Sequence, residues 1–155
     1  MDKLFASVPN FAEGRSEARI RRILSALKKV EGVKILDVSS NVDADRTVVT
    51  FVGGEKALQD GIIALGRSCK KEIDLRNYNG VHPCIGALDV VPVVPCEGTT
   101  LEESKALALK IGRAYEAEVE VPVRYYAESA LEAKYKRLAD CRKGGVESLP
   151  PQLKK

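Results

Sequence analysis

The sequence predicts an α+β fold in which an antiparallel-rich sheet carries helices on one face. Two observations point to it. Short runs rich in β-branched residues alternate with segments whose apolar residues recur at helical spacing. Two of the predicted strands are also joined by a short stretch of turn formers, as in a hairpin. The order is therefore that of a ferredoxin-like βαββαβ unit, followed by an additional αβ unit and a C-terminal helix.

The predicted strands are short runs of β-branched and apolar residues, bounded by proline, glycine or other turn formers. Residues 41–45 read Asn-Val-Asp-Ala-Asp, a stretch that joins the second and third strands as a hairpin. Pro92 removes a backbone donor from the fourth strand and favours a sheet edge or a bulge there. The five strands are predicted over residues 3–8, 33–39, 47–52, 86–94 and 121–127.

Each predicted helix has one apolar face and begins or ends at a residue suited to that position. Ser16 is a good N-cap for the first helix, and Gly32 is placed to end it. Capping boxes of the form Ser/Thr-x-x-Glu open the third helix at residues 100–103 and the fourth at residues 129–132. The four helices are predicted over residues 17–31, 55–73, 101–119 and 130–142.

Length and composition fit one globular domain. The 155 residues are 45% hydrophobic and 30% charged, which is too apolar for disorder and sufficient for a core. We expect residues 1–148 to form the domain and residues 149–155 to be a tail or linker. The N-terminus lacks a signal peptide, and no apolar run approaches the ~20 residues of a membrane span, so a cytoplasmic protein without membrane contact is expected.

The charge pattern argues against nucleic acid as a partner. The formal net charge is only +3, and basic residues alternate with acidic ones on the helical faces. Aromatic residues make up 5% of the chain and do not alternate with basic ones, as a stacking surface for single strands would require.

The four cysteines do not form a metal-binding pattern. Cys69, Cys84, Cys96 and Cys141 are widely spaced and include no Cys-x-x-Cys pair, so no metal is expected and the thiols are predicted to be reduced. Cys84 lies two positions from His82, which leaves a thiolate–imidazole pair open as one interpretation.

His82 is the only histidine of the chain and stands in a stiff loop before the fourth strand. Gly80 permits unusual backbone angles, and Pro83 restricts His82 to extended geometry. Loops on rigid scaffolds often carry reactive groups, so this imidazole is a candidate for acid–base chemistry. The alternative is a half-exposed loop histidine that packs or caps.

Four segments, in order and with their spacing, resemble the N-terminal subdomain of formiminotransferases, the glutamate formimidoyltransferase family. They are Val-Pro-Asn-Phe-Ala-Glu-Gly at 8–14, Asp-Arg-Thr-Val-Val-Thr-Phe-Val-Gly at 45–53, Gly-Val-His-Pro-Cys-Ile-Gly-Ala-Leu-Asp at 80–89 and Val-Pro-Val at 121–123. The similarity extends over nearly the whole chain, to Arg-Lys-Gly at 142–144 and Ser-Leu-Pro at 148–150.

The resemblance implies transfer of a formimino group from N-formiminoglutamate to N5 of tetrahydrofolate, within histidine degradation and one-carbon metabolism. Tetrahydrofolate would be the co-substrate, with no metal. The family's catalytic histidine maps onto His82. The chemistry suits an imidazole, because one proton must leave the attacking nitrogen and another must reach the departing one. A side chain with a pKa of about 6.5 can do both.

Five further residues are candidates for substrate binding, each with a structural alternative. Arg46 could attract the anionic substrates or be a solvated surface arginine. Asn10 and Glu13 could line the cleft, or form an Asx-turn and a carboxylate near a helix N-terminus. Asp37 and Asp89 lie inside predicted strands, where each could orient His82 or cap a sheet edge.

Three positions depart from the family's usual pattern: Ser39, where an acidic residue is common, Asp45, where an asparagine precedes the arginine, and Val81, where a glutamate precedes the histidine.

Family enzymes also carry a second, similar subdomain, with the folate between the halves. We therefore expect either a transferase half that pairs with a separate C-terminal-subdomain protein or with its own copy, or a non-catalytic module that binds folate or another small anion. A purely structural, self-associating subunit is the third interpretation, and in each case a homo-oligomer or a partner protein is expected.

Overall fold

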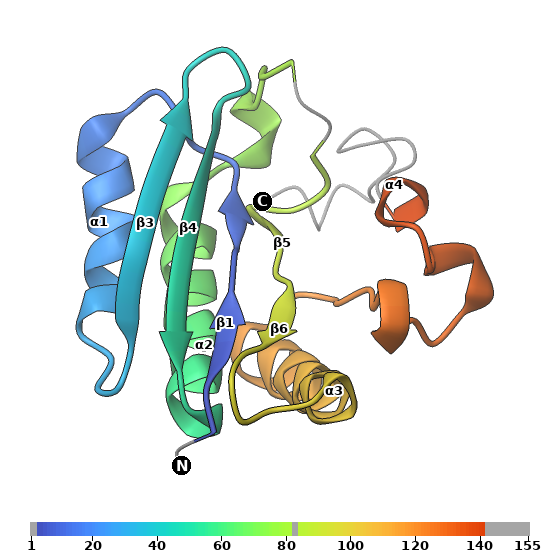
Figure 1. Ribbon diagram of the computed structural model, residues 1–155. Coiled ribbons are helices and arrows are strands. Elements are labelled where there is room, and N and C mark those ends of the chain that lie inside the picture. The colour runs from blue at the N-terminus through green and yellow to red at the C-terminus, as the bar shows by residue number, and fades with distance from the viewer. Residues whose placement is uncertain (1–2, 82–83, 142–155) are drawn as a thin grey trace.

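The computed structural model describes residues 3–81 and 84–141. Its elements follow the predicted order through the first three helices (Figure 1). They are β1 (Phe5–Ser7), β2 (Asn10–Phe11), α1 (Glu17–Lys28), β3 (Lys34–Asn41), β4 (Arg46–Gly53), α2 (Glu55–Glu72), the 3-10 helix η1 (Leu75–Asn77), β5 (Leu88–Val90), β6 (Val93–Pro95), α3 (Leu101–Val119), the 3-10 helices η2 (Ala127–Ser129) and η3 (Ala133–Tyr135), and α4 (Leu138–Cys141).

All strand pairs of the described sheet are antiparallel. β3 is an edge strand and forms a hairpin with β4, as predicted, through the turn at residues 42–45. The other side of β4 pairs with β1 and β2, which in turn pair with β6 and β5. If β1 and β2 are counted as one interrupted strand, and β5 and β6 as another, the strand order is that of a ferredoxin-like sheet.

Two prolines divide the predicted first and fourth strands without changing their register. Ser7 faces Phe51 and Asn10 faces Val48, so β1 and β2 stay aligned on β4. Pro9, between them, lacks an N–H, although its carbonyl oxygen still accepts the Val49 N–H at 3.0 Å. Pro92 likewise separates β5 from β6, as its missing donor led us to expect.

The helices α1, α2 and α3 lie side by side on one face of the sheet, with α2 in the middle (Figure 1). Alternate strand residues point into this layer, so Val49 and Phe51 are fully buried while Val48 and Val52 face the opposite side. The α+β fold with helices on one face is therefore confirmed. We refer to the side of the sheet without helices as the open face.

The N-termini of α1 and α3 form as their sequence signals indicate. The Ser16 hydroxyl accepts the Arg19 N–H at 3.2 Å. At α3 both bonds of the capping box are present, between Thr100 and Glu103. The first helix ends at Lys28, earlier than predicted, and Gly32 turns the chain into β3 with a φ of 86°.

The prediction of a fifth strand at residues 121–127 is wrong, because this segment lies along α3 and not on a sheet edge. The Val123 N–H donates to the Glu116 carboxylate at 2.8 Å, so a side chain of α3 takes the place of a strand partner. The Tyr125 ring then packs against Gly112 of the same helix.

The predicted helix from residue 130 to residue 142 is also wrong in its described part, where only η3 and α4 form. The Ser129 hydroxyl does not cap a helix but donates back to the Tyr126 carbonyl at 2.9 Å. The predicted boundary at residue 148 and the tail at 149–155 lie outside the described residues. Among the residues that are described, none of the helices has both the length and the apolar composition needed to cross a membrane.

Candidate functional site

The loop that carries the one histidine joins η1 to β5, beyond the tip of the β3–β4 hairpin. His82 and Pro83 lie outside the described residues, but both flanks of the loop are described. On the upstream side, the Val81 N–H donates to the Asp43 carbonyl at 3.2 Å, and the Tyr78 hydroxyl donates to the Ala44 carbonyl at 2.9 Å. The hairpin turn is therefore the support of this flank.

Gly80 is required at the same contact. A Cβ atom on Gly80 would overlap the Ala44 carbonyl oxygen, which is closer than van der Waals contact allows. Only a residue without a side chain lets the loop approach the turn this closely. Burial raises the pKa of the neighbouring Tyr78 phenol, so its hydroxyl is protonated and serves as the donor to Ala44 at neutral pH.

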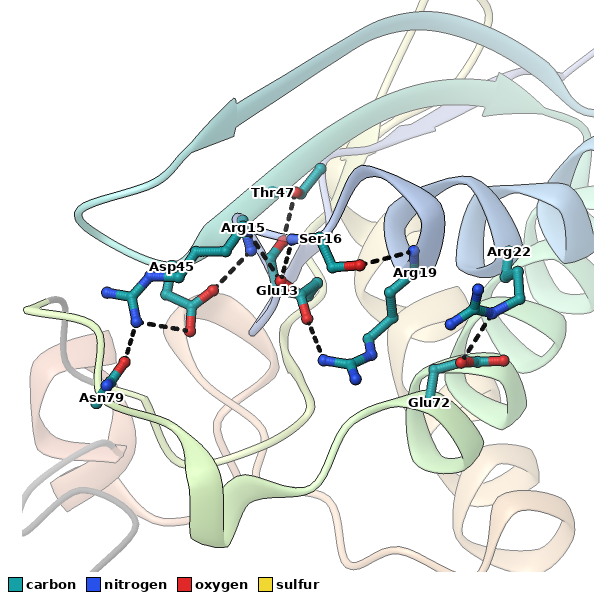
Figure 2. A network of polar contacts seen from close by, with 10 residues as sticks. Glu13, Arg15, Ser16, Arg19, Arg22, Asp45, Thr47, Glu72 and Asn79 are labelled. Carbon is teal, nitrogen blue, oxygen red and sulfur yellow. Dashed lines mark hydrogen bonds and ion pairs between the residues drawn. The ribbon is translucent and has the colours of Figure 1, made fainter.

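The loop that precedes α1 holds the β3–β4 hairpin turn (Figure 2). The Gly14 N–H donates to the Asp45 carboxylate at 2.8 Å, and Arg15 Nε donates to the Val42 carbonyl at 3.0 Å. The Arg15 guanidinium also contacts the Asn79 side chain, so it bridges the turn and the upstream flank. Asp45 adopts a φ of 51°, a left-handed conformation that aspartate tolerates better than most residues.

One carboxylate makes several of the bonds that hold the downstream flank. Asp89 Oδ1 accepts the N–H groups of Ile85 and Gly86 at 2.7 and 3.0 Å. Its Oδ2 accepts Arg46 Nη1 at 2.9 Å. The exposed fractions of the Arg46 and Asp89 side chains are 4% and 0%, so this is a buried ion pair. Arg46 is therefore not the solvated surface arginine of the alternative interpretation.

Cys84 belongs to the same flank. Its side chain is buried, and its thiol donates to the Gly86 carbonyl at 3.2 Å. This contact tightens the turn that Asp89 closes. A pairing of Cys84 with His82 involves a residue outside the described range and stays a prediction.

Asn10 shares the open face of the sheet with Arg46. Asn10 pairs with Val48, and residues 46 and 48 of one strand point to the same side. The Asn10 side chain is half-buried and donates to the Val8 carbonyl at 3.2 Å, as an amide that supports its own strand. It lies one row of the sheet away from the buried ion pair.

Asp37 also points to the open face but lies farther along it. It pairs with Thr50 and is exposed. Four residues along β4 separate Thr50 from Arg46, roughly 13 Å at the usual strand rise. The structure thus brings Arg46, Asp89 and Asn10 together, with Asp37 at a distance on the same face.

Glu13 is buried beside the N-terminus of α1 and does not join this group (Figure 2). Its carboxylate accepts the N–H groups of Arg15 and Ser16 at 2.8 and 2.9 Å and pairs with Arg19 at 2.7 Å. Burial alone would raise the pKa of Glu13, but the hydrogen bonds from Ser16, Arg15 and Arg19 outweigh it and lower the pKa. This is the helix-terminus carboxylate of the alternative interpretation.

Several supporting residues were not identified from the sequence, chiefly Tyr78, Asp45 and Arg15. The turn formers at 41–45 predicted the hairpin, but nothing in their pattern indicated that the loop at 80–81 rests on it. Gly14 and Gly80 were the available signals, because a glycine without an evident turn often marks a close backbone approach. In residues 3–81 and 84–141, no three metal-ligating side chains gather, and the absence of a metal stays a prediction.

The sequence is similar to a family of known proteins. Over residues 4–155 the sequence matches the family described as the formiminotransferase domain, N-terminal subdomain. It is 36% identical to a rat (Rattus norvegicus) formimidoyltransferase-cyclodeaminase over 154 residues, which is 99% of this chain and 28% of that protein.

Two similar proteins carry the transferase name alone. Identity is 33% to the Streptococcus pyogenes serotype M1 glutamate formimidoyltransferase, covering 99% of this chain and 51% of that protein. Identity is 39% to the Thermoplasma acidophilum glutamate formimidoyltransferase, covering 82% of this chain and 42% of that protein. The chain thus spans about half or less of the length of these relatives. The match over nearly all its residues shows that the chain belongs to the formiminotransferase N-terminal subdomain family.

Proposed function

We propose that this chain forms part of an enzyme that transfers a formimino group from N-formiminoglutamate to N5 of tetrahydrofolate. The observation that carries the proposal is the tethering of one loop from both sides. That loop contains the chain's only histidine, in a sequence similar along 99% of its length to proteins named formimidoyltransferases. A general acid–base group needs this kind of fixed presentation.

In the proposed reaction, N5 of tetrahydrofolate attacks the amidine carbon and forms a new C–N bond. The resulting tetrahedral carbon carries three nitrogens, the former imino nitrogen, N5 and the glutamate nitrogen, and the last two compete as leaving groups. His82 takes the proton from N5 and returns one to the glutamate nitrogen, whose bond to carbon then breaks. The products are 5-formiminotetrahydrofolate and glutamate, and no electrons are transferred.

The remaining candidates divide into two roles in this proposal. Arg46 and Asp89 are positioning residues, because their charges are paired beneath the loop and Asp89 closes the turn that follows His82. Asn10 and Asp37 are the proposed substrate contacts on the open face. Glu13 supports α1 and the hairpin turn and is not expected to touch substrate.

A second subdomain, from a partner protein or a second copy of the chain, is proposed to cover the open face and complete the site. Apolar residues of this face, such as Val94 and Leu4, are 41% exposed and would be covered by it. We further expect the assembly to act in the cytoplasm.

The test compares the wild-type chain with His82→Asn, each supplied with the C-terminal subdomain of a glutamate formimidoyltransferase. Glutamate release in the presence of N-formiminoglutamate and tetrahydrofolate is expected to fall by at least about 100-fold in the variant. Glu118→Gln, an exposed residue of α3, is the matched control and should leave the rate unchanged.

Equal rates for wild type and His82→Asn would remove the catalytic role of His82. If neither protein transfers the group under any pairing, calorimetric titration with tetrahydrofolate decides what is left. Binding without transfer would favour the folate-binding module. No heat at millimolar ligand would remove both interpretations.

A further inference from the structure

A cavity of about 330 Å³ lies on the helix-covered side of the sheet. It is lined by α2, α3, the β5 edge, the downstream flank of the His82 loop and the segment at residues 121–126. This volume lies within the range of sites that bind small organic molecules. Most of its described wall is apolar, and Ile62 of α2 and Ile111 of α3 are typical members.

Two tyrosine–glycine contacts fix the shape of the cavity. Tyr115 of α3 packs so closely on Gly66 of α2 that a Cβ atom on the glycine would overlap the ring. Tyr125 packs in the same way on Gly112. Because these four residues all line the cavity, its walls are held by close packing and exist before any ligand enters.

The cavity also offers a hydrogen-bond donor. Tyr115 lines the cavity and is only 9% exposed, and its hydroxyl makes no hydrogen bond to any residue that the structure describes. Burial raises the pKa of this phenol, so it carries its proton at neutral pH. A ligand with an acceptor atom can therefore accept a hydrogen bond from this hydroxyl in place of water.

A positive charge lies one helical turn away. Lys70 lines the cavity four residues after Gly66, the residue that the Tyr115 hydroxyl contacts. Its ammonium group donates to the Val119 carbonyl at 2.8 Å and, within the described residues, forms no ion pair. The acidic lining residue Asp89 is neutralised by Arg46, while Glu120 is exposed at the end of α3.

From these contacts we propose that the cavity binds a small amphipathic carboxylate, with its apolar tail among the aliphatic residues and its carboxylate between Tyr115 and Lys70. The proposal concerns binding alone and its test does not use formimino transfer, although Ile85, Gly86 and Asp89 of the downstream flank also line the cavity. Octanoate is a suitable probe, and octanol is its uncharged counterpart.

The test is a titration with octanoate of protein labelled at isoleucine methyl groups. The signals of Ile62 and Ile111 should shift, while those of Ile20 and Ile23 in α1 should not. Tyr115→Phe should weaken octanoate binding about tenfold, the effect of one lost hydrogen bond. Lys70→Met should weaken octanoate binding and leave octanol binding unchanged. Unmoved Ile62 and Ile111 signals at millimolar octanoate would overturn the proposal.

Replacing each of two alanines of α3 by phenylalanine keeps the test decisive if a tyrosine variant fails to fold. Ala108 lines the cavity, and Ala106 is exposed on the same helix. Ala108→Phe should fill the space and abolish octanoate binding with no loss of melting temperature, whereas Ala106→Phe should bind as the parent does. A folded Ala108→Phe variant with parental affinity would overturn the proposal, and so would equal weakening of octanoate and octanol by Lys70→Met.

Discussion

The two flanks of the His82 loop are held by different kinds of interaction. The upstream flank rests on several small contacts with the hairpin turn, from the Val81 amide, the Tyr78 hydroxyl and the Gly80 backbone. The downstream flank depends mainly on one carboxylate, Asp89, which is itself held in a buried ion pair with Arg46. A substitution upstream removes one contact, whereas the loss of Asp89 removes two backbone hydrogen bonds and an ion pair at once. The Cys84 thiol and the Ala12 N–H still bond the downstream flank, at the Gly86 and Ala87 carbonyls.

The largest expected effect therefore comes from Asp89→Ala. The substitution leaves Arg46 buried without its carboxylate and frees the amides of Ile85 and Gly86. We expect the free energy of unfolding to fall by about 3–5 kcal/mol, as when one partner of a buried pair is removed. Urea denaturation measures it. Glu118→Ala, which breaks an exposed pair with Arg67, is the control and should have little effect. Similar effects for the two variants would contradict the description of a buried support.

Glu13→Gln should produce the next largest effect, and one that depends on pH. The Glu13 carboxylate holds the loop that supports the hairpin turn, and its pKa is lowered in the folded protein. Its contribution to stability is therefore complete above the ordinary pKa of about 4.5 and is lost as the pH falls through the lower folded value.

We expect Glu13→Gln to cost about 1.5–3 kcal/mol at pH 7, the range for hydrogen bonds to a charged group. The difference from wild type should shrink below pH 4.5. Denaturation curves of both proteins between pH 7 and pH 3 test this. A difference that stays constant across the range would show that the charge of Glu13 is not what holds the loop.

Gly80→Ala tests the upstream flank at its tightest contact. The added methyl group would overlap the Ala44 carbonyl, so either the loop or the turn must move. The cost should be about 1–3 kcal/mol, as for other cases of overpacking. Gly54→Ala is the matched control, because the nearest atom to its new methyl group is the Lys3 carbonyl oxygen at 3.8 Å. Equal stability of the two variants would show that the contact at Gly80 is not close.

The elements that could be predicted from the sequence are those whose signals are local. The hairpin, the capping box at residues 100–103 and the apolar faces of α1 to α3 depend on neighbours within a few residues. The segment at residues 121–127 has the β-branched pattern of a strand, but an acceptor on α3, Glu116, bonds its backbone. Competition from a partner outside the segment leaves no trace in the periodicity of the segment itself.

The candidate site follows the same rule. Arg46 and Asp89 were each identified from the sequence as candidate substrate-binding residues. Their ion pair could not be predicted, because the two residues are 43 positions apart and only the sheet register brings them together. The sequence left two roles open for Glu13, a cleft residue or a carboxylate near a helix N-terminus. Only the position of its carboxylate at the α1 N-terminus decides between them. The supporting role of Tyr78 had no sequence signal, because its partner is a backbone carbonyl in a turn 34 residues away.

Tyr78→Phe is the mildest test of the upstream flank. It removes one hydroxyl that donates to the Ala44 carbonyl and leaves the ring in place. We expect a loss of about 0.5–1.5 kcal/mol, the usual net value of one hydrogen bond, measured by urea denaturation. Both Tyr78→Phe and Gly80→Ala act through the same Ala44 carbonyl, so their losses should not add fully. Tyr78→Phe and Glu13→Gln share no partner and should add within about 0.5 kcal/mol. Full additivity of the first pair would show that the two contacts at Ala44 act independently, which would contradict the description of the upstream flank as a set of contacts that share one turn.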